Sequence, residues 1–203
     1  MLFIDPSLFV AKGKHRECYE HPQNKNLCIK VLLPSKSGSS LTEAEREASY
    51  YRFLMKKNTP WTMLPAFHGE IITDRGKGYV FDLIRDFDDT ISKNLDYYLS
   101  NPNLTKEQIN CLSNALDQLS NYLLRWNIIT MNIHSRNIVY QRLSNDNGRL
   151  VIVDDVGNSD FIPCASYISC LARLKIKRKW RRFLFFLLKE YPDNKFLKSK
   201  ISV

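Results

Sequence analysis

The chain has 203 residues, of which 44% are hydrophobic and 12% are aromatic, so it can build a core as one domain or as two small lobes sharing a cleft. This composition disfavours a disordered chain, and no apolar run approaches the length that spans a bilayer. The N-terminus lacks a basic stretch and contains Asp5 and Pro6, so we expect no signal peptide. Five scattered cysteines without a C-x-x-C pair indicate free thiols and therefore a cytoplasmic protein.

The net charge of +9 is concentrated near the C-terminal end of the chain. Residues 173–182 include seven Lys or Arg and no acid, and subtracting these charges from the total leaves about +2 for the rest. Like charges along one helix repel one another, so this cluster is a candidate contact for an acidic protein partner or an anionic surface. A solvated helix face is the plainer explanation. Nucleic acid is disfavoured, because no base-reading motif accompanies the cluster.

The N-terminal part of the chain predicts an antiparallel sheet with one inserted helix. Its apolar stretches are bounded by polar turns and lie at residues 9–31, 63–72 and 78–84. The helix is expected to start at Thr42, because Thr42 and Glu45 have the spacing of a capping box.

A polar and acidic stretch, residues 85–89, separates this part from a different one. We therefore expect a β-rich lobe at residues 1–85 and a helical lobe at residues 86–203. The helices expected in the second lobe are residues 106–126, capped by Thr105, and residues 165–190.

A single lysine, Lys30, interrupts the apolar run 27–33. Burying a lysine is costly unless a carboxylate or a ligand meets its ammonium group. Glu47 adjoins the apolar stripe of the expected helix, so we predict that it pairs with Lys30; Glu43, one turn earlier, is the weaker candidate. An edge strand would instead let the lysine side chain extend to solvent.

Two apolar runs, 137–140 and 150–153, flank a turn rich in Asn, Asp and Gly, which is typical of a β-hairpin. Asn137 stands just before the first strand, and Asp154 directly follows the second. A hairpin brings these two ends together, so an amide oxygen and a carboxylate can face the same divalent ion. Asp155 is the alternative to Asp154. The plainer explanation is that Asn137 caps a turn and that the two aspartates begin a loop.

In this order the parts resemble the protein-kinase-like fold, an α+β fold with a small antiparallel β lobe that contains one helix and a mainly helical C-terminal lobe, here reduced. The resemblance implies ATP and Mg²⁺ as cofactors. It assigns Lys30 to the phosphates, Glu47 to an ion pair with Lys30, and Asn137 and Asp154 to the metal.

The same resemblance implies that the phosphate-covering loop contains Gly13 and that the backbone from Asp82 to Ile84 meets the adenine ring. Gly13 is the only glycine of that loop, so fewer backbone N–H groups can cover the phosphates. The basic side chains beside it offer charge in their place.

Asn132 occupies the position of the kinase catalytic base, five residues before Asn137. Asparagine cannot accept a proton at neutral pH, so general-base catalysis, worth about 10²–10⁴ in rate, is missing. Asn132 can still orient a hydroxyl group, and His134 on the same loop is a candidate substitute base or phosphate contact. The short chain after Asp154 leaves no room for the helices that hold a peptide substrate in protein kinases.

Several longer motifs are similar to those of the YrbL family, the PhoP-regulatory-network proteins of enterobacteria and their relatives. They lie at residues 13–22, 76–82, 86–88, 130–131, 136–138, 154–159 and 161–163 and in the Trp- and Arg-rich tail. The resemblance implies a kinase-like fold and a gene linked to a two-component response to low magnesium, without a defined reaction.

Three functions follow from these observations. The first is a kinase-like ATP- and Mg²⁺-binding protein, either a weak kinase or a pseudokinase with a regulatory role in a PhoP-linked stress response. The second is an active phosphotransferase for a small substrate, in the manner of compact sugar and lipopolysaccharide kinases. The third is a non-enzymatic binder of nucleic acid or of a membrane surface, built on the basic tail. Thermal stabilisation by ATP and Mg²⁺ distinguishes the third function from the first two.

Overall fold

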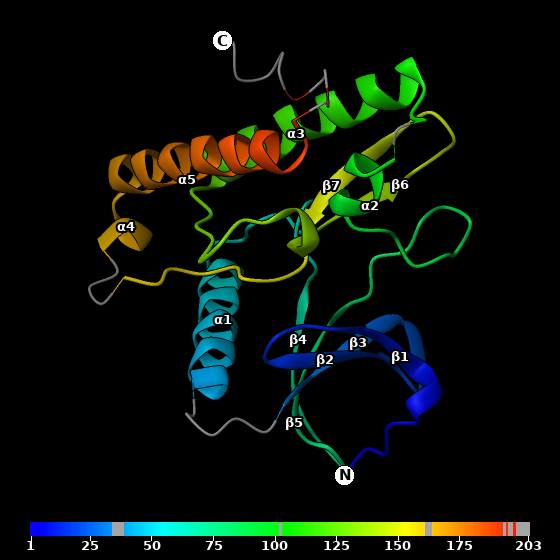
Figure 1. Ribbon diagram of the computed structural model, residues 1–203. Helices are drawn as coiled ribbons and strands as arrows, with labels where there is room; N and C mark the ends of the chain where they lie inside the picture. The colour runs from blue at the N-terminus through cyan, green and yellow to red at the C-terminus, as the bar shows by residue number, and fades with distance from the viewer. Residues whose placement is uncertain (34–38, 102, 161–163, 193, 195–196, 198–203) are drawn as a thin grey trace. The chain divides into compact units, whose positions relative to one another are not determined.

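A computed structural model describes residues 1–33, 39–101, 103–160, 164–192, 194 and 197 (Figure 1). Helices and an antiparallel sheet are both present, which confirms the expected α+β class. The chain divides into two compact units. The first comprises Met1–Trp61 and Pro65–Ile84, and the second comprises Thr62–Leu64 and Arg85–Val203.

The first unit contains a five-stranded antiparallel sheet in the order β1-β2-β3-β5-β4. Its strands are β1 (Phe9–Lys12), β2 (Arg16–His21), β3 (Asn24–Leu32), β4 (Phe67–Thr73) and β5 (Gly76–Asp82). A short 3₁₀ helix, η1 (Pro6–Leu8), precedes β1. Because β3 lies at the centre of the sheet, Lys30 is not on an edge strand, and the alternative in which its side chain extends from an edge to solvent is wrong.

The two faces of this sheet are covered differently. On one face Tyr19, Ile29, Val31 and Val80 form a buried cluster with Ile4 from the N-terminal segment. Alternation along β3 turns Lys30 to the opposite face.

Helix α1 (Ser39–Lys56) packs on that opposite face, where the rings of Tyr51 and Phe81 are 5.1 Å apart. The helix begins before Thr42, so the predicted capping box at Thr42 is wrong. No glycine or proline separates Ser39 from Thr42, and nothing in the local sequence prevents the helix from starting a turn earlier.

The second unit is mainly helical and holds the expected hairpin. Its elements are α2 (Leu95–Leu99), α3 (Lys106–Trp126), η2 (Ser135–Asn137), β6 (Ile138–Arg142), β7 (Gly148–Ile152), α4 (Cys164–Tyr167) and α5 (Ser169–Glu190). Thr105 caps α3 as expected, in a capping box with Gln108. Helix α3 packs on β7 with its apolar stripe and lies beside α5 (Figure 1). The single helix expected at residues 165–190 is divided, because Ile168 has an extended backbone between α4 and α5. The predicted motif at residues 161–163 lies outside the described residues.

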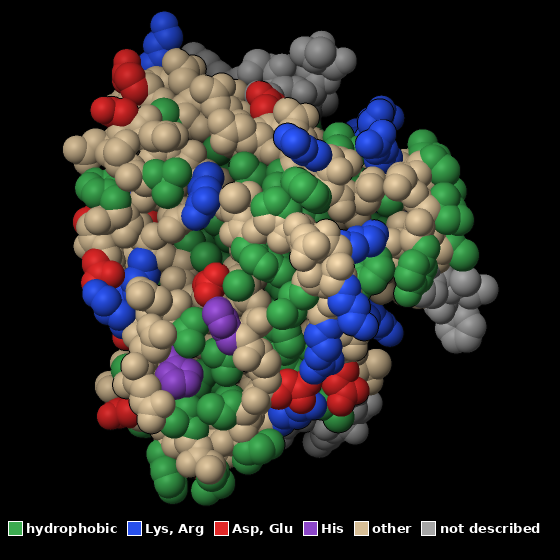
Figure 2. All heavy atoms as spheres, turned by 180° about the vertical axis from the view of Figure 1, so that it is seen from behind, with side chains coloured by type: hydrophobic (Ala, Val, Ile, Leu, Met, Phe, Trp, Pro, Cys, Tyr) green, Lys and Arg blue, Asp and Glu red, His purple; other side chains and the backbone are tan. Residues whose placement is uncertain are grey.

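Charged and apolar side chains are mixed on the surface. On the face shown in Figure 2, basic side chains stand in small groups among hydrophobic and acidic ones. Many large exposed hydrophobic side chains lie on α4, α5 and the residue between them: Tyr167, Ile168, Leu171, Leu174, Phe185 and Phe186. Within the described ranges, no helix has both the length and the apolar character to cross a membrane.

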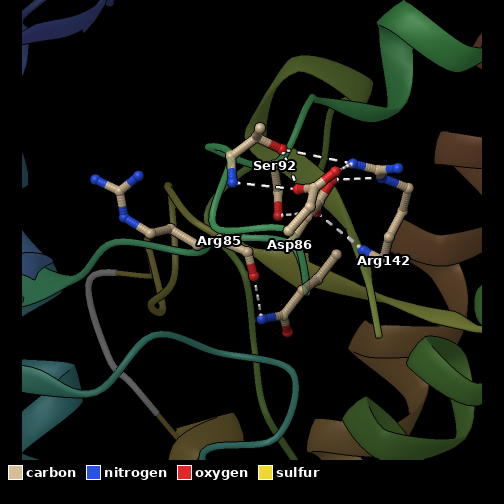
Figure 3. A network of polar contacts seen from close by, with 7 residues as sticks. Arg85, Asp86, Ser92 and Arg142 are labelled. Atoms are coloured by element: carbon tan, nitrogen blue, oxygen red, sulfur yellow. Dashed lines mark hydrogen bonds and ion pairs between the residues drawn. The ribbon is translucent and has the colours of Figure 1, made fainter. Parts of the chain in front are cut away.

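A buried carboxylate ties the start of the second unit to its hairpin (Figure 3). Asp86 is 7% exposed and accepts hydrogen bonds from Ser92 Oγ at 2.5 Å, from the backbone N–H of Arg142 at 3.0 Å and from Arg142 Nε at 2.6 Å. Arg142 also pairs with Asp88. These two carboxylates, Asp86 first, raise the pKa of Arg142. The motif at residues 86–88 therefore anchors β6.

Asp86→Ala is expected to destabilise the protein by about 3 kcal/mol in chemical denaturation. This is the lower end of the usual cost of breaking a buried pair, because the Arg142 side chain is one-third exposed. Asp88→Asn is the matched control and should destabilise the protein much less than Asp86→Ala, since Asp88 is more exposed than Asp86. Equal losses for the two variants would contradict the anchoring role of Asp86.

Candidate functional site

Two short segments of the second unit, residues 129–131 and 155–157, run side by side. Thr130 and Val156 form an isolated antiparallel bridge, and the N–H of Met131 donates to the carbonyl of Asp155 at 2.7 Å. This pairing joins the loop that leads into η2 to the residues that follow β7.

Asn137 and Asp155 meet at this junction. Asn137 Nδ2 donates to Asp155 Oδ2 at 2.8 Å, and the N–H of Val153 donates to the carbonyl of Asn137 at 2.9 Å. Asp155 has φ of 62°, in the left-handed region that few non-glycine residues adopt and that is frequent at functional sites. The structure thus brings Asn137 to Asp155, the alternative ligand, and shows no direct contact between Asn137 and Asp154.

The donor set at this junction fits a hard divalent cation. A carboxylate only accepts hydrogen bonds, so the contact with Asp155 identifies the amide nitrogen of Asn137 and leaves its Oδ1 as the atom available to a ligand. Oδ1 makes no hydrogen bond to any described residue. Mg²⁺ takes one or two protein oxygens and completes its octahedron with water and phosphate oxygens. Across the described part of the chain, no group of three or more His, Cys, Asp or Glu side chains is arranged to hold a metal.

Asn132 and His134, the two catalytic candidates, line one cavity of about 520 Å³. The loop residues 132–135 form one side of it. Three residues of α5, Phe183, Phe186 and Leu187, supply the apolar part of the other side. Lys189 and Glu190 supply its charged groups, so the cavity offers an apolar wall together with polar contacts.

The hydrogen bonds of His134 define the role of its ring. Nδ1 accepts from the backbone N–H of Arg136 at 3.3 Å, as the cap of η2. The neutral ring therefore carries its hydrogen on Nε2 and presents a donor there. This tautomer suits a contact with a phosphate or hydroxyl oxygen better than abstraction of a proton by Nε2.

Two lysines of the basic cluster 173–182 point inward and hold the paired segments. Lys179 Nζ donates to the carbonyls of Thr130 at 2.6 Å and Met131 at 2.5 Å. Lys175 is buried and its Nζ contacts Asn158 Oδ1 and Asp160 Oδ1, both at 2.6 Å.

The sequence prediction treated all seven basic residues of this cluster alike, and for these two lysines that was wrong. Their i, i+4 spacing on the same side as the buried Ala172 and Ile176 was the available signal.

Lys179 gives a pH-dependent prediction. Burial, reinforced by the charge of Lys175, lowers the pKa of Lys179 to about 8. Between this value and the unfolded value of 10.5, the folded state binds fewer protons than the unfolded state, so the contribution of Lys179 to stability rises with pH across that window. We expect the free energy of unfolding in urea, measured from pH 7 to pH 10, to rise more for the wild type than for Lys179→Met. A difference independent of pH would contradict the shifted pKa.

Lys30 and Glu47 are both buried between the sheet of the first unit and α1. Lys30 is 7% exposed, and its Nζ lies 4.7 Å from the ring centroid of Phe81. Glu47 is 1% exposed. The ion pair between them stays a prediction.

Arg16 is a partner of Glu47 that sequence reasoning missed. Arg16 donates to Glu47 Oε2 at 2.5 Å. The strand register places Arg16 opposite Leu32 on the same sheet face as Lys30, a relation that requires the register to be known. Gly13 donates its N–H to the carbonyl of Arg16 at 2.8 Å in the turn between β1 and β2. The weaker candidate Glu43 lies 3.9 Å from the ring of His15.

The proposed adenine contacts lie at the end of β5. Asp82 uses its side chain within the first unit, accepting from the N–H of Ala66 at 2.8 Å and contacting His68 Nε2 at 2.7 Å. The N–H of Ile84 donates to no other described residue. Contact of this backbone with an adenine ring stays a prediction.

Comparison with known proteins gives matches over most of the chain. The family model described as "PhoP regulatory network protein YrbL" matches residues 4–187. The chain is 36% identical over 175 residues to the YrbL protein of Escherichia coli (strain K12), which covers 86% of this chain and 82% of that relative. The YrbL protein of Shigella flexneri gives the same identity and coverage.

Proposed function

The chain belongs to the YrbL family, and we propose that it is a kinase-like protein that binds ATP with Mg²⁺ and acts mainly through that binding. The observation that carries the proposal is the contact between Asn137 and Asp155 at the end of the hairpin. The side-chain oxygen of Asn137 has no hydrogen-bond partner among the described residues, and the carboxylate of Asp155 lies beside the same side chain. Both features suit a metal ligand pair.

In this proposal Asn137 and Asp155 hold the Mg²⁺, which neutralises charge on the phosphates when it is bound. Asp155, and not Asp154, is the proposed carboxylate ligand, because its side chain is the one that reaches Asn137. Lys30, which belongs to the first unit, is the phosphate contact that the resemblance implies. It is 7% exposed and lies on β3, the central strand of the first unit.

Two features favour binding over rapid catalysis. Asn132 cannot act as a general base, and the ring of His134 presents a donor at Nε2. Arg16 contacts Glu47 in the described structure, so the glutamate proposed to position Lys30 already has a cationic partner. Arg16 begins β2 and Glu47 lies on α1, so this contact joins the sheet to the helix within the first unit. A protein that acts through binding suits a regulatory role, and the family description names a PhoP regulatory network. In this proposal the role belongs to a PhoP-linked stress response in the cytoplasm.

The proposal is tested by thermal unfolding of the full chain with ATP, with Mg²⁺ and with both. We expect a large rise in melting temperature only when both are present, because two protein ligands bind Mg²⁺ weakly without phosphate oxygens. Titration of Mg²⁺ at fixed ATP should saturate, and EDTA should reverse the shift. An unchanged melting temperature at millimolar ATP and Mg²⁺ would reject the proposal.

The cavity at residues 132–135 favours a second candidate function, phosphoryl transfer to a small acceptor. Its apolar wall and charged residues suit an amphipathic alcohol, whose hydroxyl group would lie near Asn132. Transfer of label from ATP to a small-molecule extract, followed by mass spectrometry, tests this function. Strong nucleotide binding without any labelled product would leave the binding function alone.

A further inference from the structure

The outward side of α5 combines basic and apolar side chains in one stripe. Residues 174, 178, 181 and 185 recur at intervals of four, three and four, so Leu174, Arg178, Arg181 and Phe185 lie along one line of the helix. Leu174 is 66% exposed and Phe185 is 60% exposed, and both arginines are exposed. This outer stripe lies opposite the side that carries the buried Ala172, Ile176, Phe183 and Leu187.

The remaining charges extend the same surface. Arg173, Lys177 and Arg182 are also exposed, and no acidic residue occurs between Asp160 and Glu190. Lys175 and Lys179 are turned inward, so the exposed surface of α5 keeps the other five basic residues of the cluster, two of them in the outer stripe. Charge complementarity therefore indicates an anionic partner.

The two apolar residues select among anionic partners. Leu174 and Phe185 stand at the two ends of the outer stripe, about 17 Å apart along a helix that rises about 1.5 Å per residue. A nucleic-acid backbone offers nothing apolar to an exposed leucine. At a bilayer interface, leucine and phenylalanine enter the acyl boundary while arginine and lysine contact lipid phosphates.

We propose that the outer stripe of α5 docks the protein on an anionic lipid bilayer. The helix lies in the plane of the interface, with Leu174 and Phe185 inserted and Arg178 and Arg181 on the headgroups. This binding is peripheral and reversible, because one short amphipathic stripe buries little apolar area. The four residues of the outer stripe differ from those proposed to hold the nucleotide and its metal.

The test is co-sedimentation of the full chain with vesicles of phosphatidylcholine alone and with about one-third phosphatidylglycerol. The wild type should bind only the anionic vesicles, and salt should weaken binding. Arg178→Gln with Arg181→Gln should lower the partition coefficient by about fivefold for each charge removed. Leu174→Ser with Phe185→Ser should lower it at least as much. Unfolding in urea checks that each variant is folded.

Matched controls lie at exposed positions elsewhere on the chain. Lys56→Gln with Lys106→Gln removes the same charge, and Met55→Ser removes an exposed apolar side chain of similar size. These variants should bind anionic vesicles nearly as the wild type does. The proposal would be overturned if the control and stripe variants lost vesicle binding equally. It would also be overturned if Leu174→Ser with Phe185→Ser bound anionic vesicles as well as the wild type does. Binding of an RNA or an acidic protein through Arg178 and Arg181, without vesicle binding, would overturn it as well.

Discussion

Replacing Asp155 by Asn is expected to remove the Mg²⁺-dependent part of ATP binding while leaving the fold intact. The substitution keeps the size of the side chain but removes the charge that the metal requires. Loss of an outer-shell partner usually weakens metal affinity by about 10- to 100-fold, so loss of a direct carboxylate ligand should cost at least about 100-fold. Isothermal titration of ATP with and without Mg²⁺ measures this effect.

Two substitutions of the same kind serve as controls for Asp155→Asn. Asp154→Asn should retain metal-dependent binding, since the described contact of Asn137 is with Asp155. Asp146→Asn lies in the exposed turn of the same hairpin and should behave as the wild type. Loss of binding in Asp154→Asn with retention in Asp155→Asn would assign the ligand to Asp154, as the strand boundary suggested. Equal behaviour of all three variants would exclude a metal at this junction.

Replacing Asn132 by Asp is expected to raise ATP turnover by about 10²–10⁴, the range that a general base contributes. Asn132 is exposed on the loop that lines the cavity, so the change should alter stability by less than about 0.5 kcal/mol. A single added carboxylate supplies a proton acceptor where the chain has only an amide. Steady-state release of ADP, with the acceptor extract present, measures the gain.

The control for this gain is the combination of Asn132→Asp with Asp155→Asn, which should be inactive because the restored base has no metal-bound phosphate to serve. Unchanged turnover in Asn132→Asp with intact nucleotide binding would mean that the missing base does not limit the reaction. The Arg16 contact with Glu47 would then be the next feature to change, by Arg16→Gln.

Local signals in the sequence were sufficient for most of the secondary structure. The capping box at Thr105 predicted the start of helix α3. Two apolar runs around a turn rich in Asn, Asp and Gly predicted the hairpin. Both signals are carried by residues within one turn or one hairpin. Where a local signal was ambiguous, the boundary was missed: α1 begins at Ser39 and not at Thr42, and Ile168 divides the last helical stretch.

The sequence by itself determined which residue types are available for the site and roughly where they lie in the chain. It placed Asn137 before a strand and an aspartate after the next, and it placed a lysine in an apolar run. These inferences need only the strand period and the spacing of turns, which are properties of neighbouring residues. Family membership also followed from the motifs, and the match over residues 4–187 confirms it.

Only the tertiary structure decided which partners these residues have. It brought Asp155, and not Asp154, into contact with Asn137. It placed Arg16 in contact with Glu47, and it turned Lys179 inward, where its ammonium group donates to the carbonyls of Thr130 and Met131. Each of these contacts joins residues that are 18 to 49 positions apart in the sequence. A sequence pattern reports the period of one element, whereas a contact between elements depends on register and packing that arise only when the chain is folded.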